Sequence, residues 1–225
     1  PQGEAALEKL CTAYWPPLYA YVRRAGHTPE DSEDLTQSFF ERLLTEGRIG
    51  IADRERGRFR TFLLSSLKYF LVNEWRRNSR LKRGAGSVHL SFNCSPEEAL
   101  YSREPSTRDS PDLLFERRWA TLLLDQALSS VRKDYVRARQ GPLYEALYPV
   151  MWSDPEAGTY RQIADSLGTT EGGIKVAVHR LRQRLRECIR YAVAATLSYP
   201  SDSAQVEAEI RHLQEVLRNQ SPTVG

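Results

Sequence analysis

The side chains of this sequence best suited to recognition chemistry are its charged ones, and they are segregated along the chain. Residues 30–46 contain six acids and one base, so this stretch carries a formal charge of −5. Residues 54–83 contain ten bases and two acids, which gives a formal charge of +8. The acidic stretch would repel DNA and suits a protein partner, whereas the basic stretch would attract phosphates. The net charge of +3 for the whole chain conceals this contrast.

Residues that commonly act as catalysts or metal ligands are scattered through the chain. The histidines show no spacing typical of a metal site or of a base beside a nucleophile, and the three cysteines show neither paired zinc spacing nor a disulfide framework. These residues are His27, His89, His179, His212, Cys11, Cys94 and Cys188. We therefore expect no enzyme, no metal site and no cofactor. Unpaired cysteines fit a reducing compartment, and no apolar run approaches the roughly 20 residues that cross a bilayer. We expect a soluble, cytoplasmic protein without membrane insertion.

The elements that must position the charged residues are helices. Apolar residues recur at helical spacing through most of the chain, which predicts an all-α fold of two small domains. Residues 84–112 are rich in glycine, proline and serine and read as a flexible linker. The expected domains are 1–83 and 113–195, followed by a C-terminal extension, 196–225. Helices are expected at residues 5–25, 29–45, 58–80, 113–139, 143–151, 160–167, 171–195 and 203–217.

The helix that carries the acidic stretch has a clear start. Thr28 can cap it, and Pro29 suits the first helical position because its missing N–H would be unpaired there in any case. Its apolar stripe is expected to consist of Leu35, Phe39, Phe40, Leu43 and Leu44. The C-terminal extension has its own stripe of Val206, Ile210, Leu213 and Leu217, which predicts a helix that packs on the rest of the chain or binds a regulator.

Residues 159–180 contain the sharpest local pattern, a helix-turn-helix. Thr159 and Gln162 are expected to form a capping box, Gly168 to end the first helix in a left-handed conformation, and Thr170 to cap the second. The expected core consists of Ile163, Ala164, Leu167, Ile174, Val178, Leu181 and Leu185. The opposite face of the second helix is basic, which suits a recognition helix in the major groove of DNA. The alternative is a helical hairpin whose basic face is simply solvated.

An acidic helix followed by a basic, aromatic-rich helix distinguishes this chain from an ordinary helix-turn-helix regulator. Residues 29–44 and 59–77 resemble conserved region 2 of the extracytoplasmic-function (ECF) sigma factors, and the helix-turn-helix resembles their region 4, in the same order. The resemblance covers nearly the whole chain and implies a promoter-specificity subunit of bacterial RNA polymerase. Its implied partners are core polymerase, through the β′ coiled coil and the β flap, and promoter DNA. An anti-sigma factor is a further candidate partner.

In this family an Asp-Leu-x-Gln segment docks on the β′ coiled coil of the polymerase. The segment corresponds to Asp34, Leu35 and Gln37 here, and the resemblance extends the implied polymerase-binding set to Glu33, Glu41 and Arg42. The family's basic helix binds the melted non-template strand of the minus-10 element. Aromatic rings stack on bases, at about 1–3 kcal/mol per base, while cations follow the backbone. The implied minus-10 residues are Lys68, Tyr69, Asn73, Trp75, Arg76, Arg77, Arg80, Lys82 and Arg83.

Not every ring of the basic helix needs to face DNA, because Tyr69, Phe70 and Trp75 could each belong to the core instead. The second helix of the helix-turn-helix is implied to read the duplex minus-35 element. Its implied contacts are Arg161, Thr170, Gly172, Gly173, Lys175, Val176, His179, Arg180 and Arg182. Two rival functions remain open from the sequence: a self-sufficient, dimeric helix-turn-helix regulator, and a helical scaffold whose basic surfaces bind an acidic protein.

Overall fold

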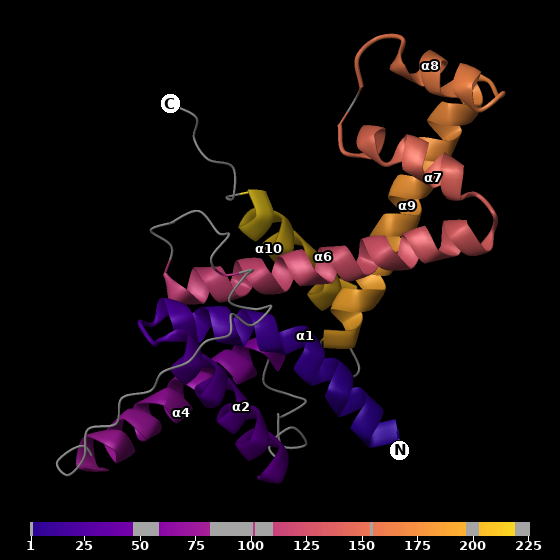
Figure 1. Ribbon diagram of the computed structural model, residues 1–225. Coiled ribbons are helices and arrows are strands. Elements are labelled where there is room, and N and C mark those ends of the chain that lie inside the picture. Colours follow the sequence, from indigo (N-terminus) through magenta and orange to yellow (C-terminus); the bar gives the residue numbers. More distant parts are fainter. Residues whose placement is uncertain are drawn as a thin grey trace, which may run out of the picture. The chain divides into compact units, whose positions relative to one another are not determined.

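Every regular element that the structure describes is helical, which confirms the all-α fold class (Figure 1). The structure is a computed structural model that describes residues 2–46, 59–81, 101, 110–153, 155–196 and 203–218. Its helices are α1 (Gln2–Arg24), α2 (Pro29–Thr45), α4 (Phe59–Leu81), α6 (Pro111–Arg137), α7 (Gly141–Leu147), α8 (Thr159–Ser166), α9 (Glu171–Thr196) and α10 (Ser203–Arg218), with a 3₁₀ turn η1 (Pro149–Met151). None of these helices is long and apolar enough to span a membrane.

The helix predicted at 143–151 is divided into α7 and η1, because Pro149 has no N–H to continue the α-helical hydrogen bonds. Most of the expected linker lies outside the described residues. Its last two positions, Pro111 and Asp112, already belong to α6. The chain forms two compact units: unit 1 comprises Pro1–Leu122, Thr196–Asp202 and Arg211–Gly225, and unit 2 comprises Leu123–Ala195 and Ser203–Ile210. The division falls inside α6, ten residues beyond the start expected for the second domain at 113.

Unit 1 buries one face of each of its helices. The buried apolar residues include Leu18 and Val22 of α1, Phe39, Phe40 and Leu43 of α2, Leu63, Leu67 and Phe70 of α4, and Phe115 and Trp119 of α6. Thr28 caps α2 as predicted, because its hydroxyl accepts the N–H of Asp31 at 3.2 Å. The apolar stripe predicted for α2 is wrong at Leu44, which is 41% exposed. The buried face is extended toward the helix start instead, by Ser32 and Thr36, whose hydroxyls donate to main-chain carbonyls one turn earlier.

A charged network inside unit 1 joins three helices. Arg60 of α4 is only 3% exposed, and its guanidinium lies 4.5 Å from the ring centroid of Trp119. Its Nε atom lies 2.9 Å from a carboxylate oxygen of Glu116, and the same oxygen is 3.2 Å from Nε2 of His212 on α10.

The tail helix α10 buries Val206, Glu209, Leu213 and Val216, so it is a packed element. Val216 takes the place that was expected for Leu217.

Unit 2 is built around the predicted helix-turn-helix. Ala164 of α8 and Ile174, Val178, Leu181 and Leu185 of α9 share one buried cluster with Tyr144, Leu147, Val150 and Met151. Gly168 has the expected positive φ of +64°, and the Thr170 hydroxyl accepts the N–H of Gly173 at 3.1 Å. The prediction of a capping box at Thr159 is wrong. Gly158, with φ of +91°, precedes the first helical residue, and its carbonyl accepts the N–H of Gln162, so α8 starts one position earlier than expected.

Candidate polymerase-binding and nucleic-acid-binding surfaces

The outer face of α2 presents the residues implied to bind the polymerase. Asp34, Gln37, Glu41 and Arg42 are exposed, while Glu33 and Leu35 are half-buried. The side chain of Gln37 donates to Glu41 at 2.8 Å, and Arg42 pairs with Glu46 at 2.7 Å. Spacings of four residues align these pairs along the helix. Because Phe39, Phe40 and Leu43 hold the inner face in the core, the polar side chains are directed outward on a fixed support.

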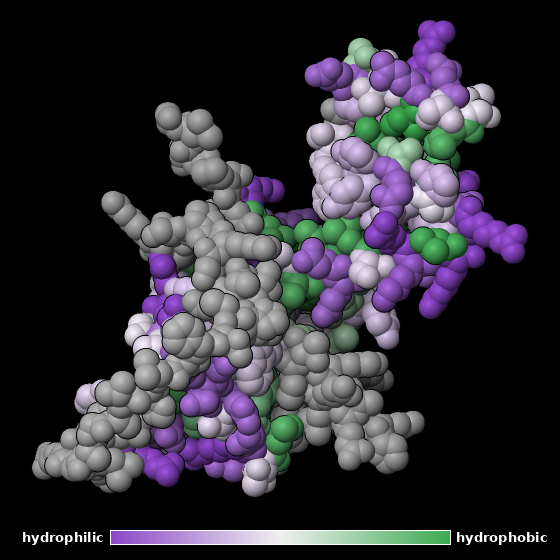
Figure 2. Space-filling model, viewed as in Figure 1, coloured by the Kyte–Doolittle hydropathy of each residue, from purple (hydrophilic) through white to green (hydrophobic). Residues whose placement is uncertain are grey.

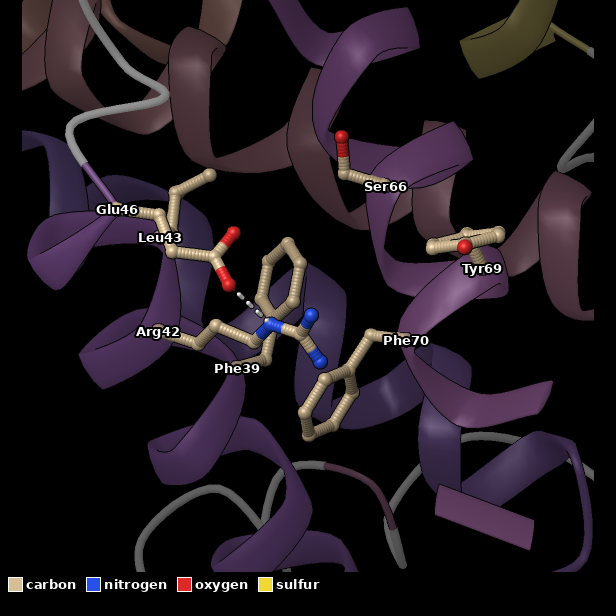
Figure 3. Close-up of a pocket in the computed structure, with 7 residues that line it drawn as sticks. All are labelled: Phe39, Arg42, Leu43, Glu46, Ser66, Tyr69 and Phe70. Carbon is tan, nitrogen blue, oxygen red and sulfur yellow. Dashed lines mark hydrogen bonds and ion pairs between the residues drawn. The ribbon is translucent and has the colours of Figure 1, made fainter. Parts of the chain in front are cut away.

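A shallow pocket lies between α2 and α4 (Figure 3). Its lining residues are Phe39, Arg42, Leu43, Glu46, Ser66, Tyr69 and Phe70. Its volume of about 20 Å³ has room for roughly one water molecule. The pocket nevertheless brings Arg42, implied to bind polymerase, to the same place as Tyr69, implied to bind DNA.

The outer face of α4 combines aromatic rings with cations. Tyr69 is 62% exposed and Trp75 is 70% exposed, whereas Phe70 is buried in the core. The open alternative for the rings is therefore resolved: two face outward and one does not. Arg76 and Arg77 are exposed on the same helix, and Asn73 is half-buried. The side chain of Arg80, together with Lys82 and Arg83, lies outside the described residues.

Lys68 is an exposed cation of α4 that is paired with an acid at the start of α6. Its ammonium forms an ion pair with Asp112 and lies 6.0 Å from the ring centroid of Tyr21. The hydrogen bond to Asp112 raises the pKa of Lys68. Lys68 thus helps to hold the start of α6 within unit 1, and a phosphate would have to compete with Asp112 for it.

The outer face of α9 presents cations beside small residues. Lys175, Val176, His179 and Arg180 are exposed, as are Arg161, Thr170, Gly172 and Gly173 around them. Lys175 lies 2.7 Å from Glu171, and this hydrogen bond raises the pKa of the lysine and lowers that of the glutamate. Figure 2 shows hydrophilic side chains projecting from the part of the molecule where Figure 1 labels α8. A helix with exposed cations and small residues, such as α9, can approach a DNA groove closely and contact phosphates on both sides.

The two glycines in the first turn of α9 differ in the space around them. A Cβ atom on Gly172 would meet nothing within 4 Å, whereas one on Gly173 would lie 3.1 and 3.2 Å from the hydroxyls of Thr169 and Thr170. Gly173 therefore leaves room for the Thr170 cap, and Gly172 leaves the backbone open to an approaching molecule. The sequence alone placed both in the DNA-binding set without distinguishing them.

Among the residues predicted to contact the minus-35 element, Arg182 differs from the others because its side chain supports the fold. Its guanidinium donates to the carbonyl oxygens of Val150, Met151 and Ser153, at 3.3, 2.8 and 3.0 Å. The residue is half-buried, unlike Arg180. We therefore leave Arg182 out of the exposed cationic surface of α9.

Comparison with known proteins relates part of the chain to a known family. Residues 10–81, which run from α1 to the last residue of α4, match sigma-70 region 2. Over 170 residues the chain is 25% identical to the ECF RNA polymerase sigma factor SigE of Mycolicibacterium smegmatis, covering 76% of this chain and 56% of that protein. Residues 10–81 therefore carry a sigma-70 region 2 domain, and the chain as a whole is similar to an ECF sigma factor. The sigma factor family is not a family of enzymes. The chain spans about half the length of the curated relative that it matches, and no solved structure matches it.

Some residues that shape the candidate surfaces were not predicted from the sequence. Glu46 holds Arg42, and Asp112 holds Lys68, so these two cations of the predicted sets are paired, as Lys175 is. The first pair has a signal in the sequence, because residues four apart on a helix are neighbours. The second has none, because its members are 44 residues apart.

Proposed function

We propose that this protein is a sigma factor, which binds core RNA polymerase and directs promoter recognition and transcription initiation. Unit 1 would dock on the β′ coiled coil through α2 and capture the melted non-template strand of the minus-10 element with α4. Unit 2 would read the duplex minus-35 element with α9 and meet the polymerase at the β flap. The observation that carries the proposal is that exposed acids on α2 and exposed cations on α4 and α9 belong to separate helices, each fixed by a buried inner face.

Affinity for DNA in the absence of polymerase should be low. The acids of α2 repel phosphates, which opposes binding of DNA by the protein alone. Core polymerase would hold both units at promoter spacing, which raises the effective concentration of the second contact once the first has formed. The protein would act in the cytoplasm, where polymerase and promoter DNA meet.

The substitution Asp34→Arg tests the polymerase contact. Reversing a charge in an interface should cost at least about 2 kcal/mol, a loss of affinity of about 30-fold or more. Co-purification with core enzyme and titration of labelled core measure the effect. Asp125→Arg is the matched control, because Asp125 is also an exposed acid on a helix but lies in unit 2. Unchanged binding by Asp34→Arg, with a native circular dichroism spectrum, would refute the assignment of α2.

A self-sufficient helix-turn-helix regulator is the second candidate, favoured by the complete helix-turn-helix and separate core of unit 2. Such proteins usually dimerise to span two half-sites. A dimer in gel filtration that protects palindromic duplex DNA without polymerase would support this candidate. A monomer that binds promoter DNA only with core enzyme would exclude it.

A further inference from the structure

The guanidinium of Arg182 makes a three-point contact with the main chain of unit 2. Nε donates to the carbonyl of Met151 at 2.8 Å, and one Nη donates to the carbonyls of Ser153 at 3.0 Å and Val150 at 3.3 Å. The acceptors lie 29 to 32 residues earlier in the sequence. Arg182 therefore ties the middle of α9 to the segment that closes η1.

The acceptors are carbonyls that the local helix cannot satisfy. The last carbonyls of a helical segment have no partner within it, and η1 ends at Met151. The side chains of Val150 and Met151 are buried in the same cluster as Ile174, Val178 and Leu181, so the carbonyls of these two residues are held close to α9. A planar guanidinium can serve several acceptors in one plane, whereas an ammonium is a point donor without that geometry.

Arg182 also differs from its basic neighbours on α9 in exposure and in hydrogen bonding. Arg180 and Arg186 are exposed, whereas Arg182 is half-buried with its donors directed to main-chain oxygens. A side chain that is held in this way would have to give up three hydrogen bonds to reach a phosphate. Its position in the sequence, two residues after Arg180, gives no sign of this difference.

We propose that Arg182 is a positioning residue for promoter recognition, which fixes α9 relative to the end of η1 and does not itself touch DNA. This inference rests on the proposed reading of the minus-35 element by α9. Lys175, Val176, His179 and Arg180 lie within two turns before Arg182 on the same helix, so the anchor acts close to the residues that meet the groove. Recognition contacts need placement to within about 0.5 Å, so we expect loss of the anchor to weaken them.

The salt dependence of DNA binding separates a positioning residue from a phosphate contact. Each phosphate contact that is lost lowers the slope of log affinity against log salt by about 0.9, whereas loss of positioning lowers affinity at every salt concentration alike. The experiment measures binding of a fluorescent minus-35 duplex by holoenzyme that contains wild-type protein, Arg182→Ala, Arg182→Lys or Arg180→Ala, at four salt concentrations. Thermal unfolding of each variant reports whether it is folded.

For Arg182→Ala we expect an affinity about ten-fold lower than wild type with an unchanged salt slope. Arg182→Lys keeps the charge but not the planar geometry, and we expect it to remain at least about five-fold weaker. Arg180→Ala should lose affinity and also lose about one unit of slope. If Arg182→Ala is unfolded, Arg182→Lys carries the test alone, with the same expected loss of affinity and the same unchanged slope.

Two outcomes would overturn the proposal. A slope reduced by about one in Arg182→Ala, with full recovery in Arg182→Lys, would make Arg182 a phosphate contact. Wild-type affinity in both variants would show that the anchor has no part in recognition. Failure of the wild-type holoenzyme to bind the duplex at all would instead count against the proposed function of α9, so the two failures are distinguishable.

Discussion

The two basic helices α4 and α9 resemble one another in charge and differ in what surrounds the charge. On α4, exposed cations stand beside the exposed rings of Tyr69 and Trp75, while on α9 they stand beside Gly172, Gly173 and Val176. Rings offer stacking platforms to unpaired bases, and small residues let a helix enter a duplex groove. Under the proposed function, the neighbours of the cations, more than the cations themselves, would decide which form of DNA each helix binds.

Each of the two helices also directs one arginine inward. Arg60 of α4 pairs with Glu116 and stacks on Trp119, and Arg182 of α9 donates to three carbonyls. The exposed charge of each helix is therefore smaller than the sequence indicates. The inward arginine of α4 pairs with a carboxylate, and that of α9 donates to main-chain carbonyls.

We expect the largest effect on the comparison of α4 with α9 from the double substitution of Tyr69→Ala with Trp75→Ala. Removing two stacking rings should cost at least about 2 kcal/mol, a loss of about 30-fold in affinity for a single-stranded minus-10 oligonucleotide. Fluorescence anisotropy with holoenzyme measures it, and binding of the minus-35 duplex should be unchanged. Tyr191→Ala is the control, because that ring is strongly exposed on α9. Equal losses on both DNA forms would remove the distinction between α4 and α9.

The next effect concerns stability and the inward arginine of α4. Glu116→Ala leaves the buried Arg60 guanidinium without this carboxylate, which should destabilise unit 1 by about 2–3 kcal/mol, since Glu116 itself is 21% exposed. The control is Glu145→Ala in unit 2, whose ion-pair partner Arg132 is 62% exposed, with an expected cost below about 1 kcal/mol. Hydrogen exchange of α4 and of α7 peptides reports the two units separately. Similar losses in both units would show that burial of Arg60 has no special cost.

A smaller and matched pair of effects tests the two helix caps. Thr28→Ala and Thr170→Ala each remove a hydroxyl that accepts a main-chain N–H at the start of α2 or α9. Each should lower stability by about 1 kcal/mol. Thr28→Ala should weaken binding to core polymerase and spare the minus-35 duplex, and Thr170→Ala should do the reverse. Titrations of each variant with both ligands check this, and crossed effects would contradict the assignment of the two helices.

The smallest effect is expected from Glu171→Gln, which removes the acid paired with Lys175 on α9. The wild-type ion pair holds the pKa of Glu171 below its usual range, so the glutamate stays charged as the pH falls until its lowered pKa is reached. Releasing Lys175 should raise affinity for the minus-35 duplex a few-fold and steepen its salt dependence by up to about 0.9. Lys175→Gln should have the opposite effect. Weaker binding by Glu171→Gln would mean that this acid supports recognition.

Much of the fold could be predicted from the sequence because the deciding signals are local. Apolar spacing predicted the eight α-helices of the described residues to within a few residues, and Thr28, Gly168 and Thr170 have the capping roles expected of them. The expectation for Thr159 was wrong, because a glycine immediately before it took a left-handed conformation and started the helix earlier.

The parts of the candidate surfaces that escaped prediction depend on distant partners. Arg60 meets Glu116 across 56 residues, and Arg182 meets Met151 across 31 residues. The periodicity of apolar residues along a helix does not indicate contacts between residues this far apart in the sequence. Exposure of the rings was likewise undecided, because Tyr69 and Phe70 are adjacent in sequence and only the packing of α4 shows which one faces the core.

In-vitro transcription with purified core polymerase on a library of genomic fragments tests the central claim most directly. The account predicts that adding this protein yields discrete new transcripts, whose start sites share one minus-35 and one minus-10 sequence, and that Asp34→Arg yields none. Transcripts unchanged by the wild-type protein, together with tight binding of duplex DNA by the protein alone, would contradict it.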